Sequence, residues 1–83
     1  MVKYVRVMLM ELTFGEKLRN LREETDMNQT ELGKRLGMTQ RKLSYLECGK
    51  CEPNIDDIRA ICRLFKVSAD YLLGIPDNLK YPK

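Results

Sequence analysis

The sequence predicts an all-α fold: one compact domain of five short helices, with two helices joined by a tight glycine turn at its centre. Apolar residues recur at the spacing of helix faces along most of the chain. Each such stretch follows a residue whose side chain can cap a helix start, and several stretches end at a glycine. The chain has 83 residues, enough for one domain with a thin core. The expected caps are Thr13, Asn28, Thr39, Asn54 and Ser68.

The first two helices have clear start signals. Thr13-Phe-Gly-Glu16 matches the capping-box pattern, in which a hydroxyl and a carboxylate satisfy free amide groups, and the helix fades near Thr25-Asp26. Asn28 is a strong N-cap with Glu31 at the third helical position, and Gly37 can form the left-handed turn that ends this helix. The inward faces comprise Phe14, Leu18 and Leu21 in the first helix, and Leu32 and Leu36 in the second.

The third helix is expected between the cap Thr39 and the terminating Gly49, with Leu43 and Leu46 directed to the core. Asn54 caps the fourth helix, where acidic residues favour the positive end of the helix dipole. Ser68 caps a last helix that ends at Leu73, before Gly74 and Pro76. The fourth helix has Asp56 and Asp57 in its first turn and an apolar stripe of Ile55, Ile58, Ile61, Cys62 and Phe65 or Leu64.

The two ends of the chain lie outside this pattern. Residues 1–12 form an N-terminal extension in which Val5, Val7 and Leu9 alternate with Arg6 and Met8, as in a strand. Since no second strand is predicted, the extension either pairs with another copy, is disordered or is dispensable. Residues 75–83 form a C-terminal tail. No apolar run is long enough to span a membrane, so we expect a cytoplasmic protein.

Positive charge is concentrated in the middle of the chain. Residues 28–51 carry five basic and two acidic residues, a net charge of +3 that equals the net charge of the whole chain. The segments on either side are each balanced. A localised positive field is typical of a protein that binds a polyanion.

Few residues offer enzymatic or metal chemistry. The chain has no histidine, so the usual Ser-His and Cys-His nucleophiles are excluded and we expect no enzyme. Cys48 and Cys51 have the spacing of half a zinc site or a redox pair, but only Cys62 remains as a further thiol ligand. We therefore expect three reduced thiols, with Cys62 in the core, and neither metal nor cofactor.

The outward face of the third helix has the chemistry of a DNA-reading surface. Gln can bond both N6 and N7 of adenine, and Arg can bond O6 and N7 of guanine. No carboxylate precedes Glu47 in this helix to repel phosphates. In the preceding helix, Gly33 is expected to lie where the second and third helices cross steeply and their backbones approach each other closely. The outward residues are Thr39, Gln40, Arg41, Ser44 and Tyr45.

The spacing of these residues resembles the lambda-type phage repressor and Cro family of helix-turn-helix proteins. The likeness runs over residues 13–74, and it implies a compact five-helix, repressor-like domain that binds operator DNA, usually as a two-fold dimer. It is carried by Gln29-x-x-Leu32-Gly33-x-x-x-Gly37-x-Thr39, Leu43, Leu46-Glu47-x-Gly49-Lys50-x-x-Pro53, and Val67-Ser68-x-x-Tyr71-Leu72-Leu73-Gly74.

The resemblance also implies roles for single residues. Thr39, Gln40, Arg41, Ser44 and Tyr45 would face the bases, and Asn28, Gln29, Lys42 and Lys50 would contact phosphates, with Gln29 also bracing Gln40. Arg22 and Glu47 would form a structural ion pair. The chain departs from the family at three positions: Gly33 replaces an alanine and could loosen its helix, Tyr45 is bulky for base reading, and Glu52 replaces a basic residue.

Two functions fit these features. The first is sequence-specific binding of double-stranded operator DNA by a transcriptional regulator, expected to be a repressor, with helix 39–48 in the major groove. The alternative is a protein-interaction module or antitoxin with the same fold. We expect a homodimer, because one small domain buries little DNA surface. Its interface would involve Leu72, Leu73 and Ile75 of the last helix or the N-terminal strand.

Overall fold

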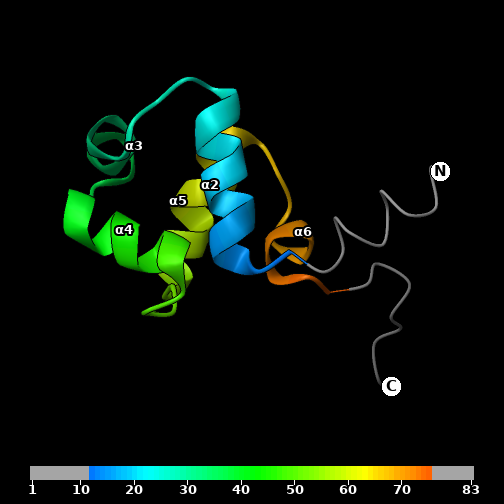
Figure 1. Ribbon diagram of the computed structural model, residues 1–83. Helices are drawn as coiled ribbons and strands as arrows, with labels where there is room; N and C mark the ends of the chain where they lie inside the picture. The colour runs from blue at the N-terminus through cyan, green and yellow to red at the C-terminus, as the bar shows by residue number, and fades with distance from the viewer. Residues whose placement is uncertain (1–11, 76–83) are drawn as a thin grey trace, which may run out of the picture.

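The computed structural model describes residues 12–75, which form five helices and no strand (Figure 1). This confirms the all-α prediction. The expected N-terminal extension, including its strand, and the C-terminal tail lie outside the described residues, apart from Leu12 and Ile75. The helices are α2 (Phe14–Glu24), α3 (Gln29–Leu36), α4 (Gln40–Cys48), α5 (Ile55–Phe65) and α6 (Ala69–Leu73).

All five expected caps are present, and each cap side chain accepts a hydrogen bond from the backbone N–H three residues later. Helices α2, α3 and α5 have complete capping boxes. Helices α3, α4 and α6 end at glycines with positive φ, as expected from the sequence. Helix α5 ends instead at Lys66, whose φ of 55° is an uncommon conformation for a residue with a side chain.

Each of the five helices contributes at least one fully buried side chain to the core. Helix α2 packs against α4 on one side and α6 on the other, and α3 packs against α4 and α5 (Figure 1). None of these five helices has the length and apolar character needed to cross a membrane. The fully buried apolar residues are Leu18, Leu32, Leu43, Leu46, Ile61 and Leu72.

Two expectations about apolar residues are wrong. Ile55 is 69% exposed, because no neighbouring element among the described residues covers that side of the first turn of α5. Leu72 is buried against the other helices and is not available for an interface between copies. The exposed apolar residues of this region are Tyr71, Leu73 and Ile75.

Two glycines allow helices to approach each other closely. A Cβ atom at Gly33 would lie 2.7 Å from the carbonyl oxygen of Met38. The close approach of the turn to α3 therefore requires a glycine here, a structural need beyond the expected loosening of the helix. A Cβ atom at Gly15 would clash with the carbonyl oxygens of Leu46 and Glu47. Gly15 therefore allows the backbone of α2 to lie against the end of α4, a role that its sequence context did not indicate.

Candidate nucleic-acid interface

Helix α4 presents a polar face to solvent. Thr39, Gln40 and Arg41 are exposed at its start, Ser44 is half-buried, and Tyr45 is 40% exposed. The opposite face carries the core leucines, and the first turn contains no acidic residue. The five residues expected to face bases therefore lie on one accessible stretch of a single helix.

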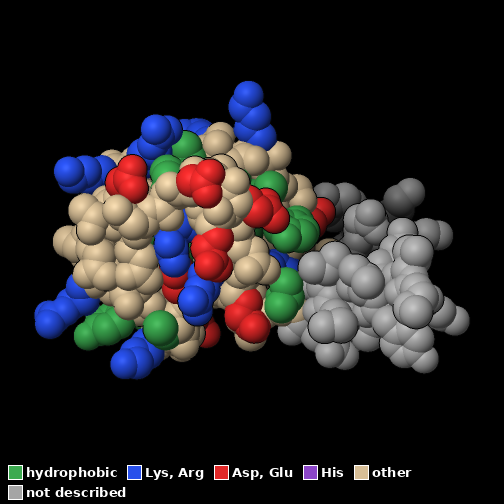
Figure 2. Space-filling view, turned by 45° about the horizontal axis from the view of Figure 1, so that its top comes forward, with side chains coloured by type: hydrophobic (Ala, Val, Ile, Leu, Met, Phe, Trp, Pro, Cys, Tyr) green, Lys and Arg blue, Asp and Glu red, His purple; other side chains and the backbone are tan. Residues whose placement is uncertain are grey.

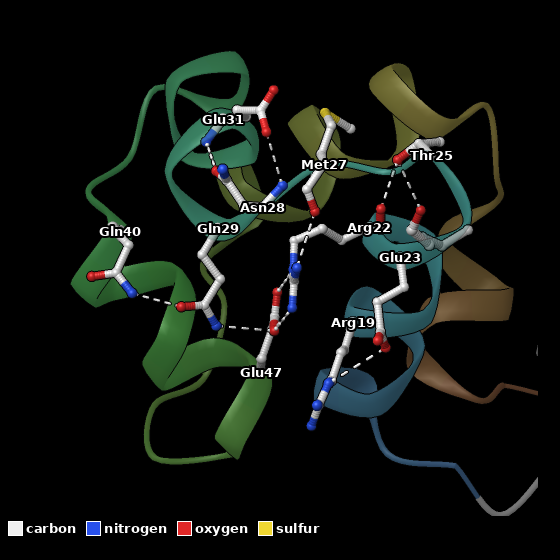
Figure 3. Close-up of polar contacts among 11 residues, drawn as sticks. Arg19, Arg22, Glu23, Thr25, Met27, Asn28, Gln29, Glu31, Gln40 and Glu47 are labelled. Carbon is white, nitrogen blue, oxygen red and sulfur yellow. Dashed lines mark hydrogen bonds and ion pairs between the residues drawn. The ribbon is translucent and has the colours of Figure 1, made fainter.

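A chain of polar contacts connects this face to the interior (Figure 3). Nε2 of Gln40 donates to Oε1 of Gln29 at 2.6 Å, and Nε2 of Gln29 donates to Oε1 of Glu47 at 3.2 Å. Gln40 is thus braced by Gln29, which is itself fixed to the C-terminal end of α4. A side chain held in this way can keep one orientation before any ligand arrives.

The Arg22–Glu47 ion pair closes this chain of contacts. Nε and Nη2 of Arg22 donate to the two carboxylate oxygens of Glu47 at 2.7 and 3.0 Å, a bidentate geometry. Only 13% of the Arg22 side chain and 4% of the Glu47 side chain are exposed. The hydrogen bonds with Glu47 raise the pKa of the Arg22 guanidinium. Because Arg22 also donates to the carbonyl oxygen of Met27, it joins α2, the start of α3 and the end of α4.

The residues expected to contact phosphates differ in availability. The side chain of Asn28 caps α3 by accepting from Glu31, and the side-chain amide of Gln29 is engaged at both its oxygen and its nitrogen. Nζ of Lys42 lies 3.0 Å from Oδ1 of Asp57 in an ion pair that the sequence did not indicate. Lys50 is exposed, with Nζ 5.6 Å from the centroid of the Tyr45 ring.

Basic side chains project from the α3–α4 side of the molecule, at the left of Figure 2, whereas most acidic side chains in this view lie nearer its middle. The three cysteines are unpaired thiols, and Cys62 packs against the core. Within residues 12–75, no three potential ligand side chains lie close enough together to hold a metal ion.

The comparisons with known proteins agree with this architecture. The family model described as "Helix-turn-helix domain" matches residues 13–72. The transcriptional activator BcrR of Enterococcus faecalis is 34% identical over 63 residues, which are 76% of this chain and 31% of BcrR. Repressor protein C2 of Salmonella phage P22 is 34% identical over 59 residues, which are 71% of this chain and 27% of C2. The chain thus corresponds to about a third or less of either relative.

Solved structures show the same likeness. The P22 c2 repressor crystallised with a synthetic operator has a TM-score of 0.71 and 32% identity, and the match covers 75% of this chain and 94% of that one. The solution structure of the P22 c2 DNA-binding domain has a TM-score of 0.70 and 31% identity. The two matches cover 75% and 77% of this chain. From its sequence and its fold, this chain belongs to the helix-turn-helix domain family, together with phage repressors and related transcriptional regulators.

Proposed function

We propose that the protein binds double-stranded DNA sequence-specifically and regulates transcription, with α4 inserted in the major groove. The observation that carries this proposal is the exposed face of α4, which has no carboxylate in its first turn and is braced from beneath by Gln29 and Glu47. An α-helix fits the major groove, where each base pair displays a distinct pattern of donors and acceptors. The similarity to a repressor crystallised with its operator supports the same conclusion.

Gln40 and Arg41 are the residues we assign to base reading. The Nε2 group of Gln40 has two hydrogens and donates one to Gln29, so the other hydrogen and Oε1 remain for an adenine edge. The exposed Arg41 has a full set of donors for guanine. Thr39, Ser44 and Tyr45 line the rest of the face and would contact thymine methyl groups or nearby edges.

Backbone contacts are assigned to the flanks of α4. Lys50 follows its C-terminal end, and its ammonium above the Tyr45 ring is directed by a cation–π contact. Asn28 and Gln29 begin α3, where free backbone N–H groups and the helix dipole favour a phosphate. Lys42, held by Asp57, is the weakest of the four expected phosphate contacts.

We also propose that the protein acts as a homodimer on DNA. Two copies reading half-sites about 34 Å apart would supply the surface that one small domain lacks. Tyr71, Leu73 and Ile75 form the exposed apolar surface at α6 that would suit such an interface. Since the relatives include both an activator and a repressor, we propose transcriptional regulation, with repression by operator occupancy as the simplest outcome.

Selection of bound sequences from a random duplex library tests the proposal. We expect one enriched sequence motif, and an affinity for it that falls steeply with salt because phosphate contacts release counterions. Arg41→Ala should relax the preference at a specific base pair, whereas Arg63→Ala, a control at an exposed arginine of α5, should leave the preference intact. Binding without any enriched motif, or binding only to a protein partner, would instead favour the interaction-module alternative.

A further inference from the structure

The starts of α4 and α5 are joined by a carboxylate that serves both helices. Oδ2 of Asp57 accepts from the backbone N–H of Asn54 at 3.1 Å and completes the capping box of α5. Oδ1 of the same carboxylate accepts from Nζ of Lys42, in the first turn of α4, at 3.0 Å. The side chain of Asp57 is only 10% exposed, whereas that of Lys42 is 39% exposed.

This contact occupies the side of α4 that has the least other support. Helix α4 packs mainly against α2 and α3, and its C-terminal end is held by the buried Arg22–Glu47 pair. Among the described residues, Lys42–Asp57 is the one side-chain hydrogen bond or ion pair that joins α4 to α5. It acts near the end of α4 where Thr39, Gln40 and Arg41 lie.

We infer that Asp57 is a positioning residue for DNA recognition, which fixes the base-reading first turn of α4 and withdraws the charge of Lys42 from general phosphate attraction. This inference rests on the proposed DNA-binding function. An unpaired lysine beside the groove would strengthen binding to every sequence equally, since a phosphate contact carries no sequence information. Pairing it with Asp57 lowers this general attraction, while the orientation of α4 favours the cognate site.

The Asp57→Asn variant separates the two effects. Its amide oxygen can still accept from Asn54, so the cap of α5 is retained, but its charge no longer holds Lys42. We expect affinity for unrelated DNA to rise and the salt slope to steepen by about 0.9, one added phosphate contact. The ratio of affinity for the selected site to affinity for unrelated DNA should fall about five- to tenfold.

Two further variants serve as controls. Asp56→Asn makes the same change of charge at an exposed neighbour that has no side-chain hydrogen bond among the described residues. It should raise both affinities together and leave their ratio unchanged. Lys42→Gln should lower the ratio as Asp57→Asn does, and the double variant should lower it no further, because both changes remove the same contact.

Two results with these variants would overturn the inference. Asp57→Asn could behave like Asp56→Asn, or Lys42→Gln could weaken both affinities equally as a simple phosphate contact would. Circular dichroism establishes folding, and if Asp57→Asn does not fold, the partly exposed Lys42→Gln carries the test alone. A wild-type chain without any sequence preference contradicts the proposed function as well, whereas a preference kept by both variants contradicts the role of Asp57 alone.

Discussion

Helices α4 and α5 begin with the same kind of cap but with opposite charge. Thr39 accepts from the N–H of Lys42, and Asn54 accepts from the N–H of Asp57, in each case at the third helical position. Helix α5 has two acidic residues in its first turn, whereas α4 has none. The two third-position side chains then pair with each other.

The difference fits the DNA-facing role that we propose for α4. A carboxylate in the first turn stabilises a helix by interaction with its dipole, typically by about 0.3–1 kcal/mol. Helix α5 has this stabilisation and is not assigned any DNA contact. Helix α4 lacks it, so its positive end and its basic side chains remain attractive to phosphates. Its support comes instead from contacts with other elements.

The largest expected effect comes from removing that support at the far end of α4. Glu47→Ala leaves the guanidinium of Arg22 nearly buried without its carboxylate, and the free energy of unfolding should fall by about 3–5 kcal/mol. Urea unfolding measures the loss. Glu23→Ala is the control, because the exposed Arg19–Glu23 pair should contribute less than about 1 kcal/mol. Equal losses in the two variants would mean that α4 does not depend on the buried pair.

Placing a carboxylate in the first turn of α4 makes its start resemble that of α5. Arg41→Glu should raise the free energy of unfolding by up to about 1 kcal/mol through the helix dipole. It should also weaken binding to the selected DNA by about 1–3 kcal/mol or more, as a base contact is lost and phosphates are repelled. Fluorescence anisotropy measures binding. Arg63→Glu, the same charge change on α5, should affect binding much less, and an equal effect would argue against α4 as the reading helix.

Cap removal should affect the two helix starts unequally. Thr39→Ala removes the hydrogen bond by which a side chain caps α4 and should cost about 1 kcal/mol of stability. Asn54→Ala should cost less, about 0.5 kcal/mol, because Asp57 still accepts from the backbone N–H of residue 54. Thermal unfolding of the two variants gives the order. The reverse order would show that the carboxylate of α5 does not compensate for a lost cap.

The smallest effect concerns the capping box of α2, which has the same design as that of α5. Hydrogen bonds from the backbone N–H and the hydroxyl of Thr13 hold the pKa of Glu16 below its ordinary value of 4.5. The resulting stabilisation is present above pH 4.5 and is lost as the pH falls through the lower, folded-state value. Between pH 6 and pH 3, the melting temperature of Glu16→Gln should therefore fall less than that of the wild type. Glu24→Gln, at an exposed site outside any capping box, should follow the wild type.

Most helix boundaries could be read from the sequence because caps act locally. A hydroxyl or amide oxygen meets an N–H three residues away, so Thr13, Asn28, Thr39, Asn54 and Ser68 mark helix starts whatever surrounds them. The outward residues of α4 followed from helical periodicity in the same way. The Arg22–Glu47 pair came from resemblance to a family, since nothing local connects two residues so far apart in the chain.

Other features depend on where distant elements lie, and only the folded chain decides them. Lys17 would be read as a surface charge, yet it is 3% exposed and its Nζ donates to the carbonyl oxygen of Tyr71 at 2.7 Å. The contact of Asp57 with Lys42 and the close approach of α4 to Gly15 likewise depend on how the helices are arranged. Helical periodicity defines the direction of a side chain relative to its own axis, but burial and partners depend on the neighbouring helices. The exposed polar face of α4 is thus a local property, whereas its fixed orientation is a property of the whole fold.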